Sequence, residues 1–356
     1  MTSPLSLALR SLALRRFARA TAAVRGAALA LVVVTVLSGC GTLVGLGPVP
    51  TDTVGGAVDA ARAKTVAARV IADAVKADAV PTAAGDASRA AVYSGDALVA
   101  ARADAKLASV TGATGRADRA LAATPPVVLA VSRGLTYPRS MVVQTTRAKS
   151  GLPVLSLLVT PDVRSPYRIA ASATMLPGAS VKSFAPLIQG SEPLGGGAGG
   201  GAGDDAGLAV APLTLTKQYA AALAFPAPKP TGATSFVTGD SFAQGVRASA
   251  TNQNTSMHGV GSFTQEHTAQ GVLGGMRTAD GTGALVFAAL DRRDTFLNRA
   301  KGTLTPSASF TLLTGLSSVT AEADLSTLEI VVFFVPDTGQ AVTVAAEEHL
   351  YDASGV

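Results

Sequence analysis

The spacing of apolar residues along the chain changes from helical to extended, and it does so twice. Val66, Val70 and Ala74 recur at helical spacing until Pro81, whose ring cannot continue a helix. Two further helices begin at aspartates, which cap helix N-termini. The helices expected in the first half are 57–80, Asp86 to Gly95, and Asp96 to about Ser109.

After these helices, apolar residues come in short runs bounded by Gly, Pro, Ser or Asp, which is typical of β-strands. The strands expected in the first half are 127–131, 140–146, 152–160 and 167–175.

The second half repeats this order. Its expected helices are 213–225, a helical turn at 235–238, and a helix that Asp240 caps and that reaches toward Asn252. Its expected strands are 260–270, 272–278, 284–290, 307–313, 328–335 and 340–348. The run 328–335 (LEIVVFFV) is the most apolar of these, which favours a strand covered on both faces. Asp280-Gly281 and Asp337-Thr338-Gly339 are hairpin signals.

A glycine-rich segment, Gly195–Gly207, separates the halves, and eight of its 13 residues are glycine. It does not link a predicted strand to a helix, as a phosphate-binding loop does, so we interpret it as a flexible linker. Short matches join the two halves: Gly95–Leu98 with Gly239–Phe242, and Arg147–Gly151 with Arg277–Gly281. A duplicated domain and chance similarity both explain such short matches.

The fold class expected from this order is α+β, with two similar modules. In each module, N-terminal helices pack on a curved antiparallel sheet. The expected divisions are a first module at 57–190, a linker at 191–207 and a second module at 208–356.

The N-terminus has the organisation of a secretory signal. Arginines are followed by an uncharged 11-residue run, Ala27–Leu37, which is too short to span a bilayer. The run ends in Leu37-Ser38-Gly39-Cys40, which matches the bacterial lipobox. In that motif a signal peptidase cleaves between Gly39 and Cys40, and the thiol carries diacylglycerol. We therefore expect a lipoprotein signal peptide at 1–39 and a lipidated tether at 40–56.

An uncleaved signal anchor with a buried Cys40 is the alternative to this lipoprotein interpretation. Arg15-Arg16-Phe17 matches a twin-arginine signal only in part, so the general and the twin-arginine export routes are both open.

The lipobox, the glycine linker and the two halves together resemble a lipoprotein family of high-GC Gram-positive bacteria. Each half, with its Gly-Asp step before the last helix, resembles the cone-shaped nuclear-transport-factor-2-like fold. This resemblance implies an open cavity between sheet and helices. It implies no particular reaction, because the fold hosts enzymes, ligand binders and scaffolds.

The composition excludes or disfavours several kinds of binding site. The chain has 29 basic and 24 acidic residues, but five arginines lie within 1–39, which leaves 24 of each and no basic run for nucleic acid. One cysteine excludes an intramolecular disulfide, and three histidines leave no common zinc site. The absence of tryptophan disfavours a glycan site.

Gly239-Asp240-Ser241 resembles the nucleophile block of SGNH-type esterases. Those enzymes also need a later Asp-x-x-His, because serine without a base is a poor nucleophile. Here Ala346 stands three residues before His349. The alternative interpretation is that Asp240 only caps a helix.

Histidines offer a second candidate site. Glu266-His267 and His258 would be an acid and base set in a cone cavity, as in ketosteroid isomerase. Because neighbours on a strand point to opposite faces, Glu266 and His267 cannot both line one cavity, and a solvent-facing pair is expected. His349, with Glu347 and Glu348, is expected on an edge strand, where charges discourage pairing with another chain.

Two charged segments are interpreted as surface features. Asp204-Asp205 supplies too few oxygens for calcium. The segment Arg164–Arg168 places two cations around a tyrosine and is interpreted as a turn, with an exposed contact as the alternative.

The sequence therefore predicts a lipid-anchored protein on the extracytoplasmic face of the cell membrane that binds or scaffolds without catalysis. Its expected partners are the membrane, through lipid on Cys40, and either an envelope protein or a small apolar ligand. No nucleic acid, cofactor or metal is expected. The alternative is a cone-cavity enzyme of the isomerase or cyclase type, or a Ser241-dependent esterase.

Overall fold

A computed structural model describes residues 55–81, 83–195, 207–229 and 233–356, which all belong to one unit of the chain, Asp52–Val356. The predicted signal peptide, Cys40, most of the tether, Asp204-Asp205 and most of the glycine linker lie outside the described residues. None of the described helices is long and apolar enough to cross a membrane.

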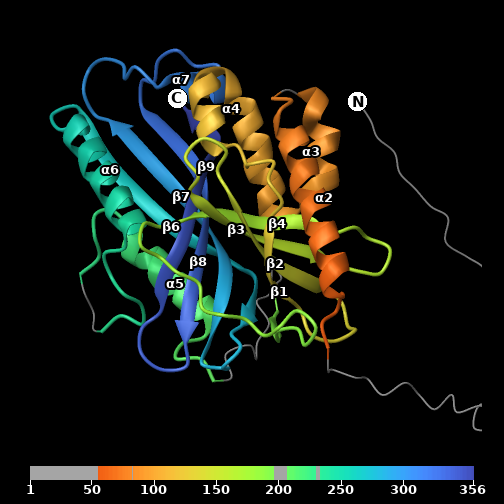
Figure 1. The fold of residues 1–356 in the computed structure, drawn as a ribbon. Coiled ribbons are helices and arrows are strands. Elements are labelled where there is room, and N and C mark those ends of the chain that lie inside the picture. The colour runs from red at the N-terminus through yellow and green to blue at the C-terminus, as the bar shows by residue number, and fades with distance from the viewer. Residues whose placement is uncertain (1–54, 82, 196–206, 230–232) are drawn as a thin grey trace, which may run out of the picture. The chain divides into compact units, whose positions relative to one another are not determined.

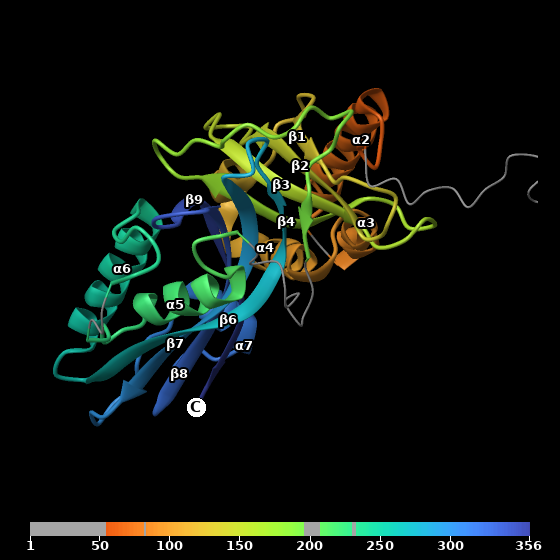
Figure 2. The same ribbon diagram turned by 90° about the horizontal axis from the view of Figure 1, so that it is seen from below.

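Nine antiparallel strands form one sheet that curls into a half-barrel, as Figures 1 and 2 show. The strand order is β1-β2-β3-β4-β9-β8-β7-β6-β5. The strands are β1 (Val127–Val131), β2 (Arg139–Thr146), β3 (Pro153–Thr160), β4 (Arg168–Met175), β5 (Pro193–Leu194), β6 (Gly261–Arg277), β7 (Gly283–Asn298), β8 (Glu322–Pro336) and β9 (Val342–Gly355). The predicted α+β class and the curved antiparallel sheet are confirmed.

The two halves of the chain share this sheet. Strand β4 of the first half pairs with β9 of the second, and β5, which precedes the glycine linker, pairs with β6. Each half does place helices before strands, as expected. The boundary expected at 191–207 does not divide the sheet, and the similarity of the halves stays a prediction.

Helices cover both halves of the sheet (Figure 1). They are α2 (Ala60–Asp78), the 3₁₀ turn η1 (Ala83–Gly85), α3 (Asp86–Val92), α4 (Gly95–Arg119), α5 (Pro212–Leu223), α6 (Ser241–Met257) and α7 (Ala308–Thr314). Helices α2 to α4 pack on β1–β4, around Ile71, Met141 and Ile169. Helices α5 and α6 pack on β6–β8, around Tyr219 and Phe333.

Apolar side chains from both halves fill the interior of the half-barrel. Leu155 and Leu157 of β3 meet Phe287 of β7 and Ile330 of β8 there, and all four are at most 1% exposed. On β8, Ile330 faces this interior and Phe333 faces α5. Strand β8 is therefore apolar on both faces. The prediction that 328–335 is doubly covered is confirmed.

Several expected elements differ from the structure. Residues 307–313, expected as a strand, form helix α7, because the Ser307 hydroxyl accepts a hydrogen bond from the Phe310 amide and caps it. The turn at 235–238 is not helical; Phe236 instead bridges to Ala341. The two strands expected between 260 and 278 are one strand, β6, whose register shifts twice near Gly271 and Gly274.

One end of the half-barrel closes through the segment before β5. Ser191 forms a bridge with Ser132, just beyond β1, and its carbonyl accepts a 2.7 Å hydrogen bond from the Arg133 amide. The preceding Gly190 has a φ of 68°, and a Cβ at this position would lie 2.8 Å from the Gly56 Cα. Only glycine fits this close approach without strain.

Replacing Gly190 with alanine is expected to lower the free energy of unfolding by about 2–4 kcal/mol, from positive-φ strain and overpacking together. The control is Gly151→Ala, because Gly151 has a φ of 70° but nothing within 4 Å of the added Cβ. Urea denaturation measures both. Equal losses in the two variants would contradict the closure described here.

Candidate functional site

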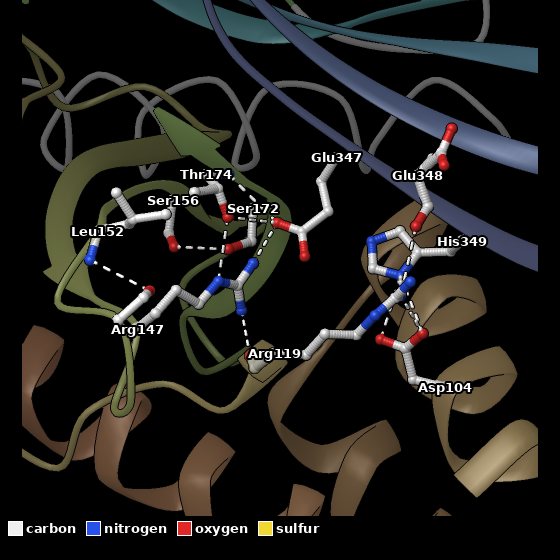
Figure 3. A network of polar contacts seen from close by, with 11 residues as sticks. Asp104, Arg119, Arg147, Leu152, Ser156, Ser172, Thr174, Glu347, Glu348 and His349 are labelled. Atoms are coloured by element: carbon white, nitrogen blue, oxygen red, sulfur yellow. Dashed lines mark hydrogen bonds and ion pairs between the residues drawn. The ribbon is translucent and has the colours of Figure 1, made fainter. Parts of the chain in front are cut away.

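A charged cluster fills the space where β4 and β9 diverge. These strands pair only at Thr174↔Ala346 and Met175↔Ala345, and from Glu347 onward the partners of β9 in the described sheet belong to β8. Figure 3 shows the polar side chains that gather at this point. We define the junction cluster as Asp78, Tyr93, Asp104, Arg119, Arg147, Glu347 and His349.

The centre of the junction cluster is an ion pair between Arg147 and Glu347, whose side chains are only 9% and 12% exposed. Arg147 also donates to the Thr174 hydroxyl through Nε, at 3.0 Å, and to the Arg119 carbonyl through Nη1. Glu347 Oε2 accepts two more hydrogen bonds, from the Thr174 amide at 3.2 Å and its hydroxyl at 3.0 Å. A buried ion pair needs such additional bonds to offset the loss of hydration.

A second group connects helix α4 to strand β9. Arg119, at the end of α4, contacts Asp104 at 2.6 Å and donates to the Glu348 carbonyl at 3.3 Å. His349 Nδ1 lies 3.1 Å from both Asp104 oxygens. Burial opposes ionisation of Asp104, but His349 and Arg119 outweigh it and lower its pKa. Strand β9 lies between β8 and β4 in the strand order and is not the edge strand that we expected, although at His349 it pairs with β8 alone.

Asp78 and Tyr93 complete the junction cluster. Although Asp78 as a whole is exposed at the end of α2, its carboxylate accepts a 2.6 Å hydrogen bond from the Tyr93 hydroxyl, and the residue lines a small cavity. Burial of this carboxylate raises the pKa of Asp78 to about 6. The folded protein therefore binds a proton at Asp78 more tightly than the unfolded chain does.

We expect the stability of the protein relative to Asp78→Asn to fall as pH rises from about 4 to about 6. In that window the folded state holds the proton that the unfolded chain has lost, so ionisation opposes folding. Denaturant unfolding of both proteins across this pH range measures the difference. Asp337→Asn, in the exposed β8–β9 turn, controls for the loss of one charge. A constant difference across the range would refute the buried carboxylate.

The cavity inside the junction cluster has a volume of about 60 Å³, which suits a few water molecules and not a substrate. Its acids and bases bond to one another and to the backbone. This arrangement suits a joint that holds two parts of the sheet together where their pairing ends.

A second buried network lies on the sheet face that α6 covers. His267 Nδ1 lies 3.0 Å from Glu329, and Arg292 lies 3.1 Å from Glu329 and 2.7 Å from Glu348. The side chains of His267 and Glu329 are fully buried. Glu266 is exposed, so the two neighbours do face opposite sides as predicted.

The expectation that both Glu266 and His267 face solvent is wrong for His267. Its side chain is buried and contacts Glu329 on a neighbouring part of the sheet. His258, which follows the last residue of α6, is exposed. The structure therefore does not bring these three residues together.

Asp240 acts as the helix cap that the sequence predicted. Its Oδ1 accepts a 2.9 Å hydrogen bond from the Ala243 amide, and the Tyr219 hydroxyl donates to the same carboxylate. Within the described residues no histidine bonds to the adjacent Ser241 hydroxyl. Ser241 lines a surface groove of about 390 Å³ together with Glu348 and Arg292.

A larger cleft, of about 550 Å³, lies between three segments that are distant in sequence. They are the start of α4 (Ser94 to Asp96), the β3–β4 turn with the start of β4 (Pro161 to Arg168) and the bulged middle of β6 (Gln270 to Leu273). Val159, Val272 and Leu273 are among the apolar residues that line it, and Asp96 and Arg168 also line it. We call this the inter-half cleft.

Two residues of this cleft, Asp96 and Arg168, have features in the sequence that suggested other roles. Asp96 was expected as the cap of a helix, whereas it lies in the first turn of α4, after Gly95. Arg168 belongs to the charged turn segment. No local pattern places β6 beside either, because the approach depends on the curl of the whole sheet.

No family model, no curated protein and no solved structure matches this chain.

Proposed function

We propose that this chain is a lipid-anchored protein on the extracytoplasmic face of a bacterial membrane, and that it binds a small ligand in the inter-half cleft. The lipid would be attached to Cys40. The proposal includes the expectation that the chain consists of two similar nuclear-transport-factor-2-like modules, which the helices-then-strands order of each half supports.

The inter-half cleft is the observation that carries the binding function. Small-molecule sites are concave, mostly apolar and contain a few polar groups that orient the ligand. The cleft has this composition and a volume of about 550 Å³. In contrast, the acids and bases of the junction cluster already bond to one another, and the cavity between them holds about 60 Å³.

The sequence Leu37-Ser38-Gly39-Cys40 supports the lipid anchor. Attached acyl chains contribute about 0.8 kcal/mol per buried methylene, so two or three chains hold a folded body stably at a membrane. The residues between Cys40 and the first described helix would then link that body to the lipid.

Labelled fatty acid supplied to the source cells is expected to enter the wild-type protein and to be absent from Cys40→Ser. Serine has no thiol to carry the diacylglycerol. Ser38→Ala is the matched control, because the lipobox accepts a small apolar residue at that position, and it should keep the label. Label on Cys40→Ser would reject the lipoprotein proposal.

A further inference from the structure

Two side chains of opposite charge in the inter-half cleft have no partner in the described part of the chain. The Asp96 carboxylate makes no hydrogen bond or ion pair there, and neither does the Arg168 guanidinium. The Arg168 Nε is buried and has no hydrogen-bond partner among the described residues. A buried polar group without a partner is unfavourable, and more so when it is charged.

Two acids close to this pair do have partners. Asp162, in the same turn as Arg168, accepts hydrogen bonds from the Arg164 amide at 2.8 Å and the Ser165 amide at 2.9 Å. Asp86, close to Asp96 in sequence, forms a two-point ion pair with Arg102. Asp96 and Arg168 are the two charged residues that line the inter-half cleft, and neither has a partner in the described part of the chain.

The environment of Asp96 is consistent with a binding group. Burial raises the pKa of Asp96, so its carboxylate has lost part of its hydration. A ligand cation or hydrogen-bond donor would replace the lost water. Arg168 offers a planar set of donors that suits a carboxylate or phosphate.

We infer that the ligand of the inter-half cleft is a small amphipathic zwitterion, with an apolar body on Val159 and Leu273, an anionic group at Arg168 and a cationic group at Asp96. This inference rests on the proposed binding function. The two cleft charges sum to zero, so a ligand that carries both charges neutralises each of them without leaving a buried excess.

Three probes of similar apolar size test this assignment: 8-aminooctanoate, octanoate and octylammonium. Each is titrated calorimetrically into the full-length protein in lipid nanodiscs, with empty nanodiscs as blanks. We expect 8-aminooctanoate to bind at least about ten-fold more tightly than either singly charged probe, because each charge-assisted bond contributes that much or more.

Variants separate the two charges. In Arg168→Gln the preference for 8-aminooctanoate over octylammonium should disappear, and Arg168→Lys should retain part of it. In Asp96→Asn, 8-aminooctanoate should no longer bind more tightly than octanoate. Arg164→Gln, at an exposed arginine of the same turn that does not line the cleft, should change nothing.

The ranking of the three probes on the wild-type protein decides the inference even where a variant does not fold. Equal affinities would overturn the zwitterion assignment and leave an apolar binding function standing. Failure of all three probes to bind would also overturn it, and the proposed function would then be judged on the mass of the protein isolated from its membrane.

Discussion

Replacing Arg147 with methionine is expected to lower the free energy of unfolding by about 3–5 kcal/mol, as removal of one partner from a buried ion pair does. The variant leaves the Glu347 carboxylate 12% exposed and without its cation, at the point where β4 and β9 stop pairing. The Arg119 carbonyl and the Thr174 hydroxyl lose a donor as well. Equilibrium denaturation in guanidinium chloride measures the loss.

Two further variants locate this effect in the buried pair. Adding Glu347→Leu to Arg147→Met should recover most of the stability, because no unpaired charge then remains. Lys149→Met breaks the Lys149–Asp118 ion pair, whose side chains are each 52% exposed, and should cost at most about 1 kcal/mol. A loss below about 1 kcal/mol for Arg147→Met would contradict the junction described here.

Truncating Phe333 to alanine should have a similarly large effect, about 3–5 kcal/mol, which is typical of a buried aromatic residue. Phe333 is fully buried and packs edge-to-face on Tyr219, with ring centroids 5.1 Å apart. Its removal opens a cavity between β8 and α5 that the surrounding sheet and helix cannot close without losing other contacts.

The adjacent Phe334 is the matched control. It points to the other face of β8, is only partly buried, and its ring lies 4.9 Å from the Lys182 ammonium. Phe334→Ala should therefore cost clearly less than Phe333→Ala. Thermal unfolding followed by circular dichroism ranks the two variants. The reverse order would contradict the assignment of Phe333 to the α5 face of β8 and Phe334 to the opposite face.

Local patterns predicted the short strands of the first half closely. The expected 127–131 coincides with β1, and 140–146, 152–160 and 167–175 each lie within one residue of the observed strands. These runs are apolar, alternating and bounded by turn residues, so their own sequence defines them.

Two of the longer strands of the second half, β7 and β8, were predicted only in their apolar parts. Strand β7 continues from the expected 284–290 to Asn298, and β8 begins at Glu322, before the expected 328–335. Most of the additional residues are polar, and some bond across strands, as Arg293 does to Asp324 at 2.6 Å. Hydrophobic periodicity does not detect a strand that charged partners stabilise.

The candidate sites depend on contacts between distant parts of the chain. Arg147 and Glu347 are 200 residues apart, and His349 and Asp104 are 245 apart. The sequence identified Glu347, Glu348 and His349 as a charged group but offered no reason to pair them with a helix or a turn of the first half. Non-local pairing of this kind follows from the β4–β9 contact, which no local pattern encodes.

Native mass spectrometry of the full-length protein, released from its source membrane with its ligand in place, tests both the lipid anchor and the binding function. The chain is expected to begin at lipid-modified Cys40 and to carry an additional small molecule, which dissociates on denaturation. A chain without any added small molecule, or one that carries only a protein partner, would contradict binding in the inter-half cleft. A precursor that still contains residues 1–39 would contradict the lipid anchor.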